Sequence, residues 1–220
     1  MAKQEKTAKL ALYGRWDFEE LMEMTRDYIQ LYGFAYSLSD ELPAHRVSEI
    51  EYIYGKFPWR GGFSTVNFFS QLFHNIPPPS RPKVLRIQYA SPGFIEISAI
   101  AGAALAVAGF VKALCVSINA AHELYRNIQR RSVELDLSKI NLAKEQLNLT
   151  RAQIEFCGEA SGQLTKVLGL SPSQDALLEQ RTQGNKVMKT KLLLSVFRRA
   201  INLADKQVSQ MLNLGEGNDE

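Results

Sequence analysis

The residue types that most often carry out chemistry are scattered along this chain. The three histidines, His45, His74 and His122, have no carboxylate or second ligand at a helical spacing, so the pattern does not predict a metal site. Cys115 and Cys157 lie too far apart for a metal or redox motif and suit buried, unreactive thiols. We therefore predict no catalytic residues, no cofactor, no metal and no small-molecule substrate, and a protein that is not an enzyme.

Basic residues near the C-terminus are the strongest candidates for ligand contacts. They are Lys189, Lys191, Arg198 and Arg199, and they could meet anionic lipid, an acidic partner or phosphate. The alternative is a solvated helix face without a ligand. The net charge of +3 is small, so nucleic acid ranks below protein as a partner.

Small, apolar residues dominate positions 97–121, and Ile97–Val111 contains no charged residue. As a helix, that window would be roughly 22 Å long, which is short of the ~30 Å of a bilayer core. A membrane-associated helix and a buried helix of a soluble core both fit. Small side chains at three- or four-residue steps predict a helix-packing stripe, which consists of Gly102, Ala106, Gly109, Ala113 and Ser117.

Two apolar series with a seven-residue period follow. They predict a long helix over 123–157 with two apolar stripes and therefore two neighbours. The first series is Ile128, Leu135, Leu142, Leu149 and Phe156, and the second is Val133, Ile140, Leu147 and Ile154. The alternative is the central helix of a monomeric bundle.

Further helices are predicted after residue 158. Ser171 and Gln174 form a capping-box pattern with Pro172 at the first helical position. A final helix is predicted over 187–213, and its apolar positions alternate in three- and four-residue steps. The resulting seam consists of Leu194, Phe197, Ile201, Ala204 and Val208.

The sequence pattern of the N-terminal third predicts a small α+β unit. Alternation over 7–13 indicates a strand, and Asp17 and Glu20 resemble a capping box that opens a helix to about Ser37. Residues 49–54 fit a helix or a strand, 64–73 a short helix, and 84–90 a second strand. Residues 94–97 fit either a third strand or the entry to the apolar helix. The candidate hinge before that helix is Ser91, Pro92 and Gly93.

The predicted fold class is therefore α+β, with a long, mainly helical, coiled-coil-like region after the N-terminal unit. The expected divisions are an α+β domain over 1–93, a hydrophobic helix over 94–122, the two-striped helix over 123–157, a C-terminal helical segment over 158–214 and an acidic tail over 215–220. The charged start of the chain has no adjoining apolar run, so we expect a cytoplasmic protein, with association at the inner membrane as the alternative.

Several short motifs resemble uncharacterised bacterial proteins. The motifs are Leu12-Tyr-Gly-Arg-Trp16, Leu31-Tyr32 and Ile87-Gln-Tyr-Ala-Ser-Pro-Gly-Phe94, followed by a hydrophobic helix and an Arg-rich coiled segment. The resemblance spans roughly residues 10–157 and brings no known activity with it. It implies a bacterial source and a setting in conflict or antiviral defence.

The pattern as a whole predicts a non-enzymatic protein that self-assembles through its helices, either at a membrane or free of it. A soluble coiled-coil adaptor, or a subunit of a larger complex, is the alternative. Nucleic-acid binding through the basic last helix is a third reading, and an active site assembled from distant residues ranks below these.

Overall fold

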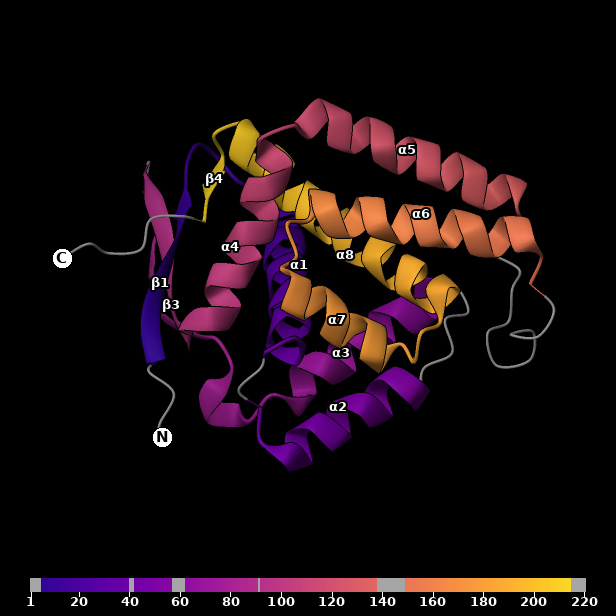
Figure 1. The fold of residues 1–220 in the computed structure, drawn as a ribbon. Coiled ribbons are helices and arrows are strands. Elements are labelled where there is room, and N and C mark those ends of the chain that lie inside the picture. The colour runs from indigo at the N-terminus through magenta and orange to yellow at the C-terminus, as the bar shows by residue number, and fades with distance from the viewer. Residues whose placement is uncertain (1–4, 40–41, 57–61, 91, 138–148, 215–220) are drawn as a thin grey trace.

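A four-stranded antiparallel sheet lies at one end of the molecule, and the described helices lie on one side of it (Figure 1). The computed structural model describes residues 5–39, 42–56, 62–90, 92–137 and 149–214. The strands are β1 (Glu5–Leu12), β2 (Lys83–Gln88), β3 (Gly93–Ile100) and β4 (Leu212–Asn213). The helices are α1 (Phe18–Ser37), α2 (Ala44–Lys56), α3 (Gly62–Asn75), α4 (Ala101–Cys115), α5 (Ile118–Glu134), α6 (Arg151–Val167), α7 (Pro172–Arg181) and α8 (Lys186–Val208), with a short 3-10 turn at Pro78–Ser80.

The sheet joins distant parts of the chain in the order β2-β3-β1-β4. Leu10 of β1 pairs with Ile95 of β3, and both side chains are buried beneath the helices. One apolar core extends from Leu10 to Leu212. The fold is therefore α+β, as predicted, but the N-terminal strands and the C-terminal helices share this core. The expected division after residue 93 falls inside β3.

Two helix starts follow from local sequence. Asp17 precedes α1, and its backbone N–H donates to Glu20 Oε2 at 3.4 Å. Ser171 precedes α7, where its Oγ accepts from the backbone N–H of Gln174 at 3.2 Å. Both predicted capping boxes are confirmed, and α1 ends at Ser37 as expected. Of the two readings for 49–54, the helix is confirmed, because this segment lies within α2.

The apolar segment divides between a strand and two helices. Residues 97–100 complete β3, because they pair with β1 as far as Ile100 opposite Glu5. Helix α4 begins only at Ala101, and α5 follows it with a bend of 92°. The prediction of one hydrophobic helix over 94–122 is thus wrong, and strand 94–97 is the correct alternative.

One face of helix α4 is buried in the core, and the opposite face is exposed. Its buried side chains are Ala103, Val107, Phe110, Val111 and Leu114, and it packs against α1 and α8. Among the described residues, no single helix meets the length and hydropathy needed for a bilayer span; only the bent pair α4–α5 meets them jointly.

The long helix predicted over 123–157 is interrupted. Helix α5 ends at Glu134, and Asp136 takes a positive φ of 54°, which turns the chain out of the helix. A new helix starts after Thr150, whose Oγ1 accepts from the backbone N–H of Gln153 at 3.2 Å. This third capping box was missed, so the continuous two-striped helix is wrong and a long coiled coil is not confirmed.

The two heptad series meet different surroundings. Ile128 and Phe156 of the first series are buried, and Leu135 and Leu149 pack partly against the core. Val133 and Ile154 of the second series are exposed. Three other members, Ile140, Leu142 and Leu147, lie outside the described residues.

The last helix is shorter than expected. It ends at Val208, and residues 212–213 form β4 beside β1. Phe197, Ile201 and Ala204 of the predicted seam are buried within this chain, Leu194 is half-buried and Val208 is exposed. Most of the seam therefore packs against the chain's own core and does not await a partner helix.

The candidate hinge lies in a tight turn between strands. Gly93 begins β3, so the turn joins β2 to β3 and does not lead into the apolar helix. A Cβ at Gly93 would lie 2.8 Å from the carbonyl oxygens of both Gln88 and Ala90, which is too close for any other residue. Pro92 is exposed, and Ser91 lies outside the described residues. A hinge before the apolar helix is therefore wrong, because that helix starts after β3.

Candidate anion-binding cleft

A cleft of about 680 Å³ opens between α1, α3, α5 and α8. Ligand pockets commonly enclose about 300–1,000 Å³, so this cleft can hold a small molecule. Its described lining includes both charges and polar groups: Glu23, Arg26, Asp27, Gln30, Thr65, Val66, Tyr125, Gln129, Ser132, Lys191, Leu194, Ser195, Arg198, Arg199 and Asn202.

Arg199 provides a fixed positive charge on the α8 side. Its guanidinium lies 4.1 Å from the centre of the buried Phe69 ring, its Nε donates to Gln30 Oε1, and its Nη1 donates to the carbonyl of Ser195 at 2.7 Å. Burial lowers the pKa of Arg199 to about 10, with Asp27 acting in the opposite direction. The side chain therefore stays charged at neutral pH while its position is held on several sides.

Asp27 is the principal acid beside Arg199. Its Oδ2 accepts a hydrogen bond from Asn202 Nδ2 at 3.0 Å. Burial raises the pKa of Asp27, while the Asn202 hydrogen bond and the charge of Arg199 oppose that shift. This carboxylate therefore titrates nearer to neutrality than an ordinary aspartate.

Helix α5 supplies the opposite polar wall. Tyr125 stacks on Phe197 with ring centres 5.3 Å apart and planes 12° from parallel. Its hydroxyl accepts from Gln129 Nε2 at 2.8 Å. Burial raises the pKa of Tyr125, although Arg198 and Arg199 partly oppose this, so the phenol remains a neutral hydrogen-bonding group.

The charges in the lining are unequal. Arg26, Lys191, Arg198 and Arg199 are basic, whereas Glu23 and Asp27 are acidic. Four cations around two carboxylates leave an excess of two positive charges, and a partly enclosed site strengthens their field.

The four basic residues predicted as ligand contacts are divided between two sites. Lys191, Arg198 and Arg199 line the cleft. Lys189 lies elsewhere, with Nζ 2.9 Å from Asp175 Oδ1 and 2.7 Å from Glu179 Oε2. As an anion contact, Lys189 is therefore a wrong choice, because α7 already supplies its counterions.

Sequence patterns missed the contributions of other helices. Arg26 stands among acids on α1, and Tyr125 and Gln129 belong to α5. Their four-residue spacing on α5 was the only local signal, because it places both on one helix face. Nothing local predicted that this face would lie opposite α8.

The predicted packing stripe lies on the outer face of α4. Gly102, Gly109 and Ser117 are exposed, and Ala106 and Ala113 are half-buried. A Cβ at Gly102 or Gly109 would meet no atom within 4 Å. Gly102 and Gly109 are therefore open to solvent, whereas Ala106 packs partly against the core and Ala113 lies close to Gly169. Ser117 lies beyond the end of α4, at the N-cap of α5.

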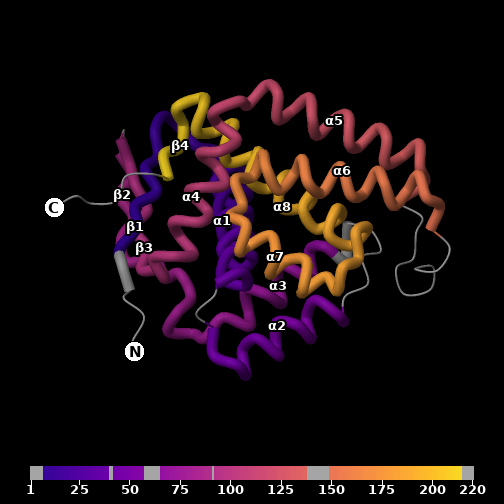
Figure 2. The backbone as a smooth tube through the Cα atoms, in the orientation of Figure 1, coloured from indigo at the N-terminus to yellow at the C-terminus, as the bar shows by residue number. Residues whose placement is uncertain are grey.

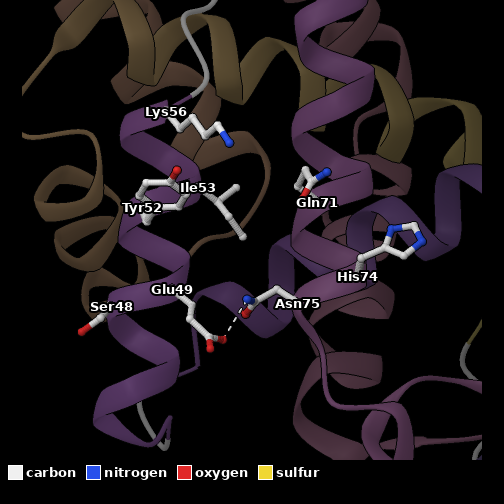
Figure 3. Close-up of a pocket in the computed structure, with 8 residues that line it drawn as sticks. All are labelled: Ser48, Glu49, Tyr52, Ile53, Lys56, Gln71, His74 and Asn75. Atoms are coloured by element: carbon white, nitrogen blue, oxygen red, sulfur yellow. Dashed lines mark hydrogen bonds between the residues drawn. The ribbon is translucent and has the colours of Figure 1, made fainter.

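A second groove, of about 510 Å³, lies between α2 and α3 (Figure 3). Glu49 and Asn75 face each other across it, with Asn75 Nδ2 donating to Glu49 Oε2 at 3.0 Å. His74 points away from Glu49 in Figure 3, and its Nδ1 lies 2.7 Å from the Ser70 carbonyl. His74 Nδ1 also lies 3.3 Å from Ser70 Oγ, but Ser70 is not among the described residues that line this groove.

Of the other chemical candidates, His122 on α5 meets a carboxylate of α8, with its Nε2 2.8 Å from Asp205 Oδ1. In the part of the chain that the structure describes, no three His, Cys, Asp or Glu side chains could together hold a metal ion. Burial raises the pKa of both Cys115 and Cys157, which disfavours the reactive thiolates.

No family profile, curated protein or solved structure matches this chain. The likeness to uncharacterised bacterial proteins, and the defence setting that it implies, therefore stay predictions.

Proposed function

We propose that this chain is a non-catalytic binding protein whose cleft between α1, α5 and α8 takes a small phosphorylated ligand. The observation that carries this proposal is the excess of cations around an open cleft, with Arg199 already held in place by Phe69 and Gln30. Guanidinium groups match the geometry of phosphate oxygens, and a prepositioned arginine loses little freedom on binding.

The hydrogen bonds of the lining favour binding over catalysis. The Ser195 hydroxyl donates to the carbonyl of Lys191 at 2.9 Å, and the Tyr125 hydroxyl accepts from an amide. Neither partner is a base that could activate a nucleophile. The remaining capacity of these groups suits hydrogen bonds to ligand oxygens.

Calorimetric titration with inorganic phosphate and pyrophosphate tests this function. The double variant Arg26→Glu/Arg198→Glu changes two exposed side chains of the lining. We expect its affinity for pyrophosphate to fall at least about tenfold, because two attractive charges become repulsive.

The exposed Lys166 on α6 lies outside the cleft lining, so Lys166→Glu is the matched control and should keep wild-type affinity. Absence of binding to the wild-type protein, or an equal loss in the control, would contradict the proposal.

Self-association is a second candidate function, favoured by the outer face of α4. Leu105 and Val116 are mostly exposed there, beside the open stripe of Gly102 and Gly109. Small residues allow a second helix to approach closely, either in water or at a membrane. The protein would then assemble through α4 while its cleft stays accessible.

Light scattering on the full chain, with and without mild detergent, tests the second candidate. A defined oligomer that Leu105→Glu converts to a monomer would support it, and a wild-type monomer in both conditions would contradict it. An oligomer that forms only with detergent would place the assembly at the membrane.

A further inference from the structure

Strand β2 forms one edge of the sheet. It is the outermost strand in Figure 2, and β3 is its neighbour in the order β2-β3-β1-β4. Among the described strands, none pairs with its outer side. All six residues of β2 are exposed. An edge strand presents backbone N–H and C=O groups that can pair with another extended chain.

The core-facing side of β2 extends past its helical cover. Val84 pairs with Ile97 and Ile87 with Ile95, so each pair points to the same face of the sheet. Ile95 and Ile97 are buried, yet Val84 is 59% and Ile87 65% exposed. The helices thus cover β3 and leave Val84 and Ile87 as an apolar ledge on β2. Leu85 and Tyr89 are also exposed along this segment of the chain.

The same strand is basic. Residues 77–94 contain Arg81, Lys83 and Arg86 and no Asp or Glu. Arg86 lies 5.4 Å from the Phe94 ring, and its sheet partner on β3 is Glu96. Glu96 also lies opposite Lys9 of β1, so one carboxylate faces Arg86 and Lys9, and Arg81 and Lys83 add further positive charge. An acidic chain would therefore meet a positive excess along this edge, in addition to the apolar ledge.

These charges argue against a second copy of β2 at this edge. Antiparallel pairing of two β2 strands would bring their lysines and arginines together, and like charges across a ladder are unfavourable. Acidic side chains on a different partner strand would replace this repulsion by attraction, whereas the irregularity between Val84 and Arg86 affects either kind of pairing equally.

We propose that β2 binds an extended acidic segment of a partner protein as an additional strand of the sheet. Backbone hydrogen bonds would supply affinity, as in other cases of strand addition. Alternate apolar side chains of the segment would pack on Val84 and Ile87, while its Asp and Glu residues meet Lys83 and Arg86. This interaction is independent of the cleft and of its ligand.

A random library of displayed twelve-residue peptides, selected on the full-length protein, tests the proposal. We expect the enriched peptides to alternate apolar and acidic residues. Fluorescence polarisation with the best peptide should show about tenfold weaker binding to Lys83→Glu/Arg86→Glu, and a peptide with Lys in place of its acids should regain binding to that variant.

Two further measurements complete the design. Lys56→Glu, on the exposed end of α2, is the matched charge control and should leave peptide binding unchanged. Peptide binding should also slow hydrogen exchange of the amides of 83–88. Circular dichroism verifies that each variant is folded.

The proposal fails if no peptide is enriched, if the enriched peptides lack acids, if exchange over 83–88 is unchanged, or if the Lys83/Arg86 variant binds normally. A wild-type dimer that the same variant abolishes would assign the edge to a second copy and would also overturn the proposal.

Discussion

Two parts of α8 carry basic side chains in similar sequence contexts but in different surroundings. Near its start, Lys189 is buried between two carboxylates from α7. Lys191, two residues further on, and Arg198 and Arg199, more than two turns further on, line a cleft in which cations outnumber acids. The difference lies in what the neighbouring helix contributes: α7 neutralises its lysine, whereas α1 and α5 leave a positive excess. Whether a lysine or arginine of α8 is neutralised within the fold or keeps its positive charge available in the cleft therefore depends on the helix that packs beside it.

Removing the positive charge of Lys189, which Asp175 and Glu179 neutralise, should have the greatest consequence. Lys189→Met leaves Asp175 and Glu179 facing each other without their cation, so we expect the free energy of unfolding to fall by about 2–3 kcal/mol. Urea denaturation measures this, with Lys191→Met as the paired comparison. Pyrophosphate affinity should stay unchanged in Lys189→Met. A loss of affinity in a fully folded Lys189→Met protein would show that the two parts of α8 are not separate.

An intermediate effect is expected in the cleft. Arg199→Lys keeps the positive charge but removes the planar group that stacks on Phe69 and bonds to Gln30 and Ser195. We expect pyrophosphate affinity to fall about tenfold, because an ammonium cannot occupy all these positions at once. Calorimetry measures the change, and unaltered affinity would mean that charge alone, without its geometry, attracts the anion.

The smallest effect concerns pH. Because the pKa of Asp27 is raised, this carboxylate gains a proton as pH falls toward that pKa, and the positive excess in the cleft grows from two to three. Sulfate, a dianion throughout the range, should therefore bind about two- to threefold more tightly at pH ~4.5 than at pH ~7. Asp27→Asn should remove much of this dependence; if it does not, another group controls the change.

Local signals predicted the elements that depend on neighbours in sequence. The capping boxes at Asp17 and Ser171 opened helices where expected, since a cap bonds to backbone only a few residues away. Thr150 and Gln153 form the same local pattern, but the heptad repeat that runs through them predicts an uninterrupted helix. The seven-residue period indicates which side chains are apolar. It does not predict the turn at Asp136 that follows the end of α5.

Helix α4 shows why the buried face of a helix is harder to predict than its caps. Its composition predicts a helix with a small-residue side suited to close packing, and a helix does run over Ala101–Cys115, but its bulky side chains, Val107, Phe110 and Leu114, are the ones buried in the core. The small-residue side faces outward, because burying large apolar side chains removes more surface from water than burying glycine and alanine.

The α+β class, the positions of the principal caps and the cationic last helix could be predicted from the chain alone, because they depend on composition and on contacts within a turn or two. Only the tertiary structure decided that β1 joins β3 and β4, that Lys189 is neutralised by α7, and that Arg26 and Tyr125 lie around Arg199. Such contacts join residues from about ten to about two hundred positions apart. Their formation depends on how all the apolar faces are buried together, a property that no local spacing encodes.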